Sequence, residues 1–84
     1  MKIKVLFFAG CQDVAGKKET EVEIKEGATV EMLLRKIIKD LPALESLKKG
    51  LMLAVNTEYA APDTLLKDGD EFALIPPVSG GKNV

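Results

Sequence analysis

One stretch of the chain has a long helical period, and it constrains the fold more than any other feature. From Val30 to Leu41, apolar side chains recur at the spacing i, i+3, i+4, i+7, i+8, i+11, which is the pattern of an amphipathic helix with one buried face. Thr29 is a suitable N-cap, and Pro42 ends the helix because it has no N–H to donate. A single helix covers only one face of a sheet, so the sequence predicts a sheet with one covered and one open face.

The segments on either side of this helix are predicted to be strands. Residues 2–9 are rich in β-branched and aromatic side chains, and residues 19–25 alternate between charged and less polar side chains. Residues 10–18 between them are predicted to be the loop of an antiparallel hairpin. Further along, we expect a short helical turn within residues 42–49, and strands at residues 51–56, around Tyr59 and at residues 71–75.

This order of elements predicts an α+β roll of the β-grasp kind. We expect a mixed sheet of about five strands with one main amphipathic helix on one face. The first and last strands should lie parallel in the centre of the sheet. The domain is predicted to span residues 1–76, and residues 77–84 to form a flexible C-terminal tail.

Length and charge exclude several classes of function. Eighty-four residues suffice for one small domain with a single core, but not for a deep catalytic pocket as well. The chain has 12 basic and 13 acidic residues with its lysines scattered, so no nucleic acid is expected as its main partner. No apolar run approaches the roughly 20 residues that span a bilayer, so no membrane is expected as a partner.

The chain has no histidine, which excludes His-based metal sites, His acid–base catalysis and every His-containing triad. Without a histidine to activate it, Cys11 is interpreted as a residue without chemistry rather than as a nucleophile. A single cysteine suits a reducing compartment, and we expect a cytoplasmic protein. Asp68, Asp70 and Glu71 are interpreted as a solvated turn rather than a cation site, so no bound metal or cofactor is expected.

The open face of the predicted sheet is less polar than a solvated surface should be. Several apolar side chains of the first and last strands alternate toward it, namely Leu6, Phe8, Ala73 and Ile75, and Tyr59 is expected near them. One interpretation is that loops cover part of this face, or that isolated surface apolar residues have no consequence. The other is an apolar patch on which another protein docks.

The chain ends in a stretch that no fold requires. Pro76-Pro77 ends the last strand because neither residue can donate to a ladder, and Val78-Ser79 continue as an extended segment. Gly80-Gly81 then removes the side chains, as entry into a narrow channel of a partner would require. The six residues from Pro76 to Gly81 can reach about 20 Å. A glycine-rich terminus without function is the alternative.

In these motifs the chain resembles the small, sulfur-carrier subunit of molybdopterin synthase, within the ubiquitin-like β-grasp sulfur carriers. The resemblance covers nearly the whole chain. It rests on Lys4-Val5-Leu6-Phe7-Phe8-Ala9, on Ala54-Val55-Asn56 and, most specifically, on Asp68-Gly69-Asp70-Glu71 followed by Pro76-Pro77-Val78-Ser79-Gly80-Gly81.

The resemblance implies a carrier that is not itself an enzyme. An ATP-dependent adenylating enzyme would activate the carboxylate of Gly81, and a sulfur donor would convert it to a thiocarboxylate. The large synthase subunit, in a heterotetramer with the carrier, would then use this sulfur to build the dithiolene of molybdopterin from cyclic pyranopterin monophosphate. The residues that match the threading tail are Pro77, Val78, Ser79 and Gly80, and those that match the docking positions are Phe8, Tyr59 and Ile75.

The chain departs from this family at its end, where Lys82-Asn83-Val84 follow Gly81. While they are attached, Gly81 has an amide and no free carboxylate, so we expect these three residues to be removed before activation. A ubiquitin-like sulfur carrier for thiamine or cysteine biosynthesis and a ubiquitin-like protein modifier are alternatives. An interaction domain whose last residues have no function is a further one.

Overall fold

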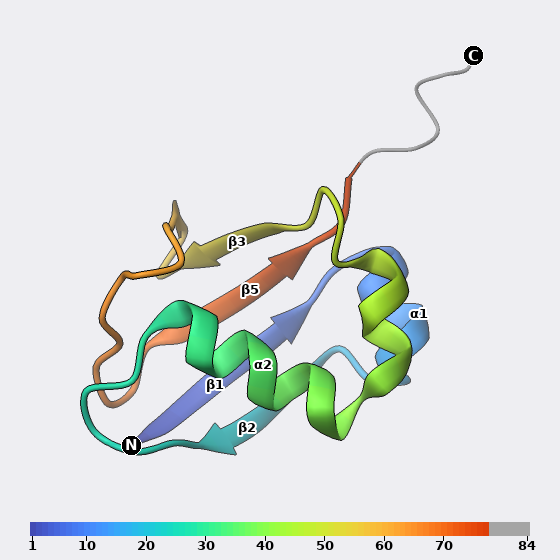
Figure 1. Ribbon diagram of the computed structural model, residues 1–84. Coiled ribbons are helices and arrows are strands. Elements are labelled where there is room, and N and C mark those ends of the chain that lie inside the picture. The colour runs from blue at the N-terminus through green and yellow to red at the C-terminus, as the bar shows by residue number, and fades with distance from the viewer. Residues whose placement is uncertain (78–84) are drawn as a thin grey trace.

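A mixed sheet of five strands, crossed on one face by one long helix, forms the body of the protein (Figure 1). The computed structural model describes residues 1–77. In chain order the elements are β1 (Lys2–Phe7), α1 (Gly10–Ala15), β2 (Glu19–Glu23), α2 (Val30–Asp40), the 3₁₀ helix η1 (Pro42–Leu47), β3 (Met52–Val55), β4 (Glu58–Tyr59) and β5 (Glu71–Ile75).

The strands have the spatial order β2-β1-β5-β3-β4. β1 pairs antiparallel with β2 and parallel with β5. β3 pairs antiparallel with both β5 and β4. The first and last strands are therefore parallel neighbours inside the sheet, and the predicted β-grasp fold is confirmed.

The core lies between α2 and the face of the sheet toward which Ile3, Val5 and Phe7 alternate. Each of these side chains is at most 2% exposed, as are Phe72 and Leu74 of the neighbouring β5. The buried side chains that α2 contributes are Val30, Leu33 and Ile37. As predicted, the helix is capped by Thr29, whose Oγ1 accepts the N–H of Met32 at 3.3 Å.

Residues 10–18 were predicted to be a loop, and this prediction is wrong, because they contain α1. The chain enters α1 at Ala9, with φ 47° and ψ −126°, and leaves it at Gly16, with φ 75°. α1 lies beside η1 at one end of the sheet (Figure 1). Six residues are too few to display a helical period in the sequence, and so short a helix depends on tertiary packing for its stability.

Cys11 supplies part of that packing. Its side chain belongs to the main core cluster and is 0% exposed. Burial raises the pKa of the Cys11 thiol, because the thiolate would lose its hydration there. The interpretation of Cys11 as a residue without nucleophilic chemistry therefore agrees with its environment.

A side-chain latch formed by Asn56 and Asp70 joins the end of β3 to the start of β5. Asn56 and Thr57, with φ of 50° and 72°, form the two-residue turn between β3 and β4. Asn56 Oδ1 accepts the N–H of Glu71 at 3.0 Å, and Asn56 Nδ2–H donates to Asp70 Oδ1 at 2.9 Å. The second carboxylate oxygen of Asp70 accepts the N–H of Lys67 at 2.8 Å.

We expect Asn56→Asp to lower the free energy of unfolding by about 1–3 kcal/mol, because the donor to Asp70 is lost and two carboxylates then face each other. Adding Asp70→Asn exchanges donor and acceptor, so the double variant should recover most of the loss. Urea denaturation of the wild type, the two single variants and the double variant gives the coupling energy. If the double variant loses as much free energy of unfolding as the two single variants together, Asn56 and Asp70 do not stabilise the protein through contact with each other.

The buried thiol of Cys11 should make stability fall in alkaline solution. The pKa is raised in the folded state, so the unfolded chain loses the proton first as the pH rises. Stability is therefore unaffected below the unfolded-state pKa and decreases above it, by at most about 1.4 kcal/mol per pH unit.

Cys11→Ala is the matched comparison for this pH effect. It should be less stable than the wild type at neutral pH, because it leaves a cavity. Its free energy of unfolding should decrease less than that of the wild type between about pH 8 and about pH 10. Urea denaturation at both pH values measures the two decreases, and equal decreases would argue against a buried titrating thiol.

Candidate functional site

An apolar row crosses four strands on the open face of the sheet. The registers pair Leu6 with Ala73, and Ala73 with Ala54. Ala54 is paired in turn with Tyr59. Residues that are directly paired point to the same face, so these four side chains share the face that α2 leaves open. The two central residues are alanines, whose short side chains leave the surface lower in the middle of the row than at its ends.

A hollow of about 260 Å³ lies over these alanines. We call it the sheet-face hollow, and its lining consists of Leu6, Phe8, Ala54, Thr57, Tyr59, Glu71, Ala73 and Ile75. The lining includes the three residues that match the docking positions of the family resemblance, so the structure brings Phe8, Tyr59 and Ile75 together. Phe8 is 46% and Tyr59 75% exposed. Large aromatic side chains with this much exposed area are the kind that anchor protein–protein interfaces.

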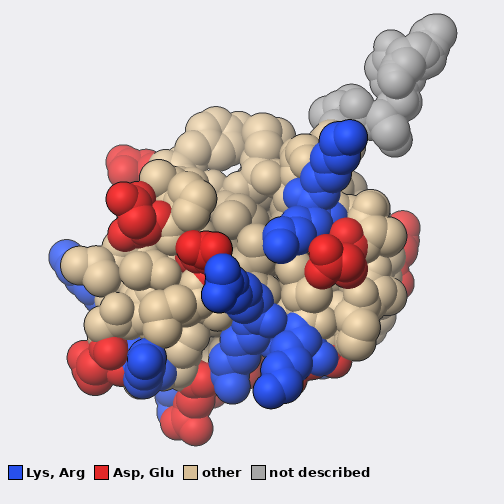
Figure 2. All heavy atoms as spheres, in the orientation of Figure 1, with Lys and Arg blue, Asp and Glu red and all other residues tan. Residues whose placement is uncertain are grey.

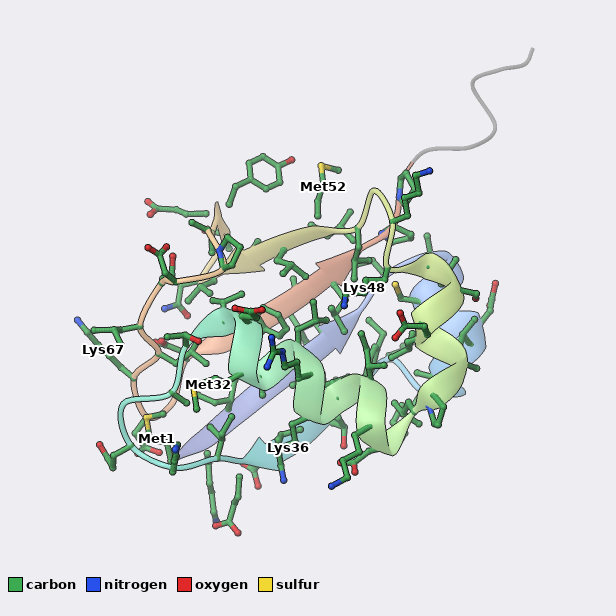
Figure 3. The ribbon with its side chains drawn as sticks, viewed as in Figure 1. Met1, Met32, Lys36, Lys48, Met52 and Lys67 are labelled. Carbon is green, nitrogen blue, oxygen red and sulfur yellow. The ribbon has the colours of Figure 1, made fainter. Side chains whose placement is uncertain are left out.

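The contribution of β3 was missed by the reasoning from sequence. Ala54 lines the sheet-face hollow, and Met52, 39% exposed, is paired with Ile75 beside it. Met52 projects from β3 away from α2 (Figure 3). The alternation of side chains along β3 could have revealed this contribution. Leu53 and Val55 pack against the core, so the alternate residues, Met52 and Ala54, point to the open face. Which parity faces the helix follows only from the register with β5.

The helix-covered side of the molecule has a different character. Lys and Arg side chains gather over α2 and η1 there, with Asp and Glu among them (Figure 2). Arg35 and Glu31 form an exposed ion pair at 2.9 Å. A larger hollow of about 450 Å³ lies on this side, and side chains of both charge signs line it together with apolar ones. Mixed exposed charges are typical of a solvated surface, whereas the sheet-face hollow is mainly apolar.

The chain leaves the sheet next to the sheet-face hollow. Ile75 ends β5 and lines the hollow, and the next residue, Pro76, is buried while Pro77 is exposed. Phe8 lies at the same end of the sheet, because its N–H donates to the carbonyl oxygen of Leu74 at 3.2 Å. The predicted sulfur-carrying residue Gly81 and the predicted tail residues Val78, Ser79 and Gly80 lie outside the described residues.

The acidic turn before β5 has a structural role. Asp68 Oδ1 accepts the N–H of Lys2 at 2.7 Å, and the N–H of Gly69 donates to the carbonyl oxygen of Lys2 at 2.9 Å. With Asp70 in the latch, these carboxylates fix the turn against the first residues of β1. Within residues 1–77, no group of three or more His, Cys, Asp or Glu side chains could hold a metal ion.

None of the helices in the described part of the chain is both long and apolar enough to cross a membrane.

Comparisons with known proteins show which family the chain belongs to. The family profile described as the ThiS family matches residues 5–81. The molybdopterin synthase sulfur carrier subunit of Chlamydomonas reinhardtii is 51% identical over 83 residues, which cover 96% of this chain and 100% of that protein.

Solved structures show the same relationship. SAMP1 from Haloferax volcanii, a small archaeal modifier protein, matches with a TM-score of 0.88 and 35% identity over 96% of this chain and 100% of that one. A chain in the complex of subunits 1 and 2 of the molybdopterin-converting factor from Helicobacter pylori matches with a TM-score of 0.70 and 28% identity, over 96% and 100% respectively. The resemblance found in the sequence motifs is confirmed: this chain belongs to the ThiS family.

Proposed function

We propose that this protein is a sulfur carrier that delivers sulfur, as a C-terminal thiocarboxylate on Gly81, to the large subunit of a molybdopterin synthase. The sulfur then serves dithiolene formation in molybdenum cofactor biosynthesis. The observation that carries the proposal is the likeness to the Chlamydomonas sulfur carrier subunit over nearly the full chain. The geometry supports it, because β5 leads directly from the sheet-face hollow to Pro76-Pro77 and then to Gly80-Gly81 in the sequence.

The chemistry requires little of the carrier beyond its carboxylate. An oxygen of the Gly81 carboxylate attacks the α-phosphorus of ATP, the bond from that phosphorus to the β-phosphate oxygen breaks, and pyrophosphate leaves. Hydrosulfide then attacks the acyl carbon of the mixed anhydride, so that a C–S bond forms while AMP leaves with the electron pair of the broken C–O bond. Loss of the S–H proton to a base of the activating enzyme gives the thiocarboxylate. The activating enzyme binds ATP and supplies the acids and bases, in keeping with a carrier that has no histidine.

The sheet-face hollow serves as the docking surface for the partners. Its rim supplies Phe8, Tyr59 and Ile75, and burial of apolar area is worth about 25 cal/mol per Å² before the losses on association. Docking on this face leaves the end of β5 at the edge of the contact. A partner held there is therefore placed beside the point from which the chain continues toward Gly81.

The last three residues must be removed before the carrier can act. Lys82-Asn83-Val84 convert the Gly81 carboxylate to an amide, and an amide cannot be adenylated at that carbon. Cleavage of the bond between Gly81 and Lys82 releases the carboxylate.

A second candidate function is that of a protein modifier joined to lysine side chains. The match to SAMP1, a small archaeal modifier protein, favours it. Both functions use the same activated Gly81, and they differ in the acceptor. Recovery of the large synthase subunit with the chain supports the first, and a ladder of covalent adducts supports the second.

Activation is tested by the mass of the protein. The chain ending at Gly81, incubated with its activating enzyme, ATP and a sulfur source, should gain the mass difference between one sulfur and one oxygen atom. The chain ending at Val84 should keep its mass under the same conditions, because its Gly81 is blocked. Intact-protein mass spectrometry distinguishes the two, and an unchanged mass for the Gly81-ended chain would refute the proposed function.

The docking surface is tested with Phe8→Asp and Ile75→Asp. Each should weaken binding to the activating enzyme about tenfold or more, because a charge replaces an apolar contact of at least about 1.4 kcal/mol. Leu65→Asp is the matched control: Leu65 is 64% exposed and does not line the sheet-face hollow.

Calorimetric titration measures the affinities, and circular dichroism verifies that each variant is folded. If both patch variants fold and bind as tightly as the Leu65 control, the docking assignment is wrong.

A further inference from the structure

The chain leaves the sheet opposite a glycine. β3 and β5 are antiparallel with Met52 paired with Ile75, and the same register, continued beyond the ladder, sets Gly50 opposite Pro77. In Figure 1 the turn before β3 lies beside the end of the red segment that follows β5. Pro76 and Pro77 have no N–H to donate, so the N–H side of a ladder cannot extend to this point. Side-chain packing must therefore hold Pro76 and Pro77 in line with β5, because ladder hydrogen bonds from their own N–H groups cannot do so.

Gly50 provides the surface for that packing. Its φ is 81°, and the turn that contains it is closed by the N–H of Leu51, which donates to the carbonyl oxygen of Lys48 at 3.1 Å. A Cβ added at Gly50 would lie 3.3 Å from Cγ and 3.5 Å from Cβ of Pro77. The ring of Pro77 thus lies directly beside the position that a side chain at residue 50 would take, at less than the ordinary van der Waals distance for its nearest atom. A side chain at position 50 would crowd this ring by a few tenths of an ångström, and it would have to adopt a φ that side chains rarely take.

We propose that Gly50 is a positioning residue for the C-terminal segment. The ring of Pro77 rests against its bare backbone, and this contact fixes the place at which Pro77, the last described residue, leaves the sheet. The inference rests on the proposed function, in which Gly81 must enter a partner's active site while the sheet-face hollow is docked. A misdirected chain would still dock but would present Gly81 in the wrong place, and small misplacements of a reacting group slow chemistry strongly.

The test compares Gly50→Ala with Gly27→Ala in the chain ending at Gly81. Gly27 has the same φ of 81°, but no atom lies within 4 Å of the Cβ that alanine would add there. Both variants therefore place an alanine at the same positive φ, and we expect a similar fall in Tm from this source. Only Gly50→Ala also crowds Pro77, so any further difference reports on the contact.

The readout is adenylation by the activating enzyme, measured as pyrophosphate release at varied carrier concentration. Gly50→Ala should lower kcat about ten- to a hundredfold, with KM within about twofold of the wild type because the docking surface is unchanged. Gly27→Ala should leave both parameters near those of the wild type. A variant that was merely less stable, but folded at the assay temperature, would not separate kcat from KM in this way.

A measurement on the wild type keeps the test decisive if Gly50→Ala does not fold. Nuclear Overhauser contacts between the α protons of Gly50 and the γ protons of Pro77 are expected, and their absence would overturn the inference. Pro77→Ala adds a second comparison. Its effect on kcat should not add to that of Gly50→Ala, because both disturb one contact.

The outcomes separate this inference from the function on which it rests. If the wild-type chain ending at Gly81 is never adenylated, the proposed function fails, and the Gly50–Pro77 proton contacts still decide whether the ring is seated. If the wild type is adenylated and Gly50→Ala has the kcat of Gly27→Ala, the positioning role is refuted while the proposed function stands.

Discussion

The structure depends on the placement of β5 between β1 and β3. The parallel pairing with β1 joins the end of the described chain to its beginning, and the antiparallel pairing with β3 holds the other edge of β5. A strand with neighbours on both sides has no free edge and cannot shift its register without breaking two ladders. The hydrophobic core, the sheet-face hollow and the point where the chain leaves the sheet all take their positions from this strand.

The alternation of β5 gives its two faces different roles. Phe72 and Leu74 are buried under α2, whereas Ala73 and Ile75 lie on the face that the helix does not cover. Because the period of a strand is two residues, the core and the open face are supplied by alternate positions of the same five residues. A substitution at Phe72 or Leu74 would act through stability, and one at Ile75 through the exposed surface.

The polar motifs of the chain support this arrangement. Asn56 and Asp70 meet across the ends of β3 and β5, and Asp68 binds the backbone of Lys2 at the start of β1. These contacts fix three strands against one another at the end of the sheet opposite to the chain exit. The turn at Asn56 also leads into β4, so the same latch helps to place Tyr59 beside the sheet-face hollow. Carboxylates that resemble a cation site in the sequence are thus used to satisfy backbone N–H groups.

The sequence by itself determined the features that depend on local patterns. The period and N-cap of α2, the bounds of β5 and the apolar parity of Leu6, Phe8, Ala73 and Ile75 all follow from residues close together in the chain. Only the tertiary structure decided the features that depend on register between distant segments. These include the formation of α1 around the buried Cys11, the addition of Met52 and Ala54 to the open face, the Asn56–Asp70 latch and the contact of Gly50 with Pro77. A local pattern shows which face of an element is apolar. The contacts between two elements are set by the pairing of strands that are far apart in the sequence, and no short stretch of sequence contains this pairing.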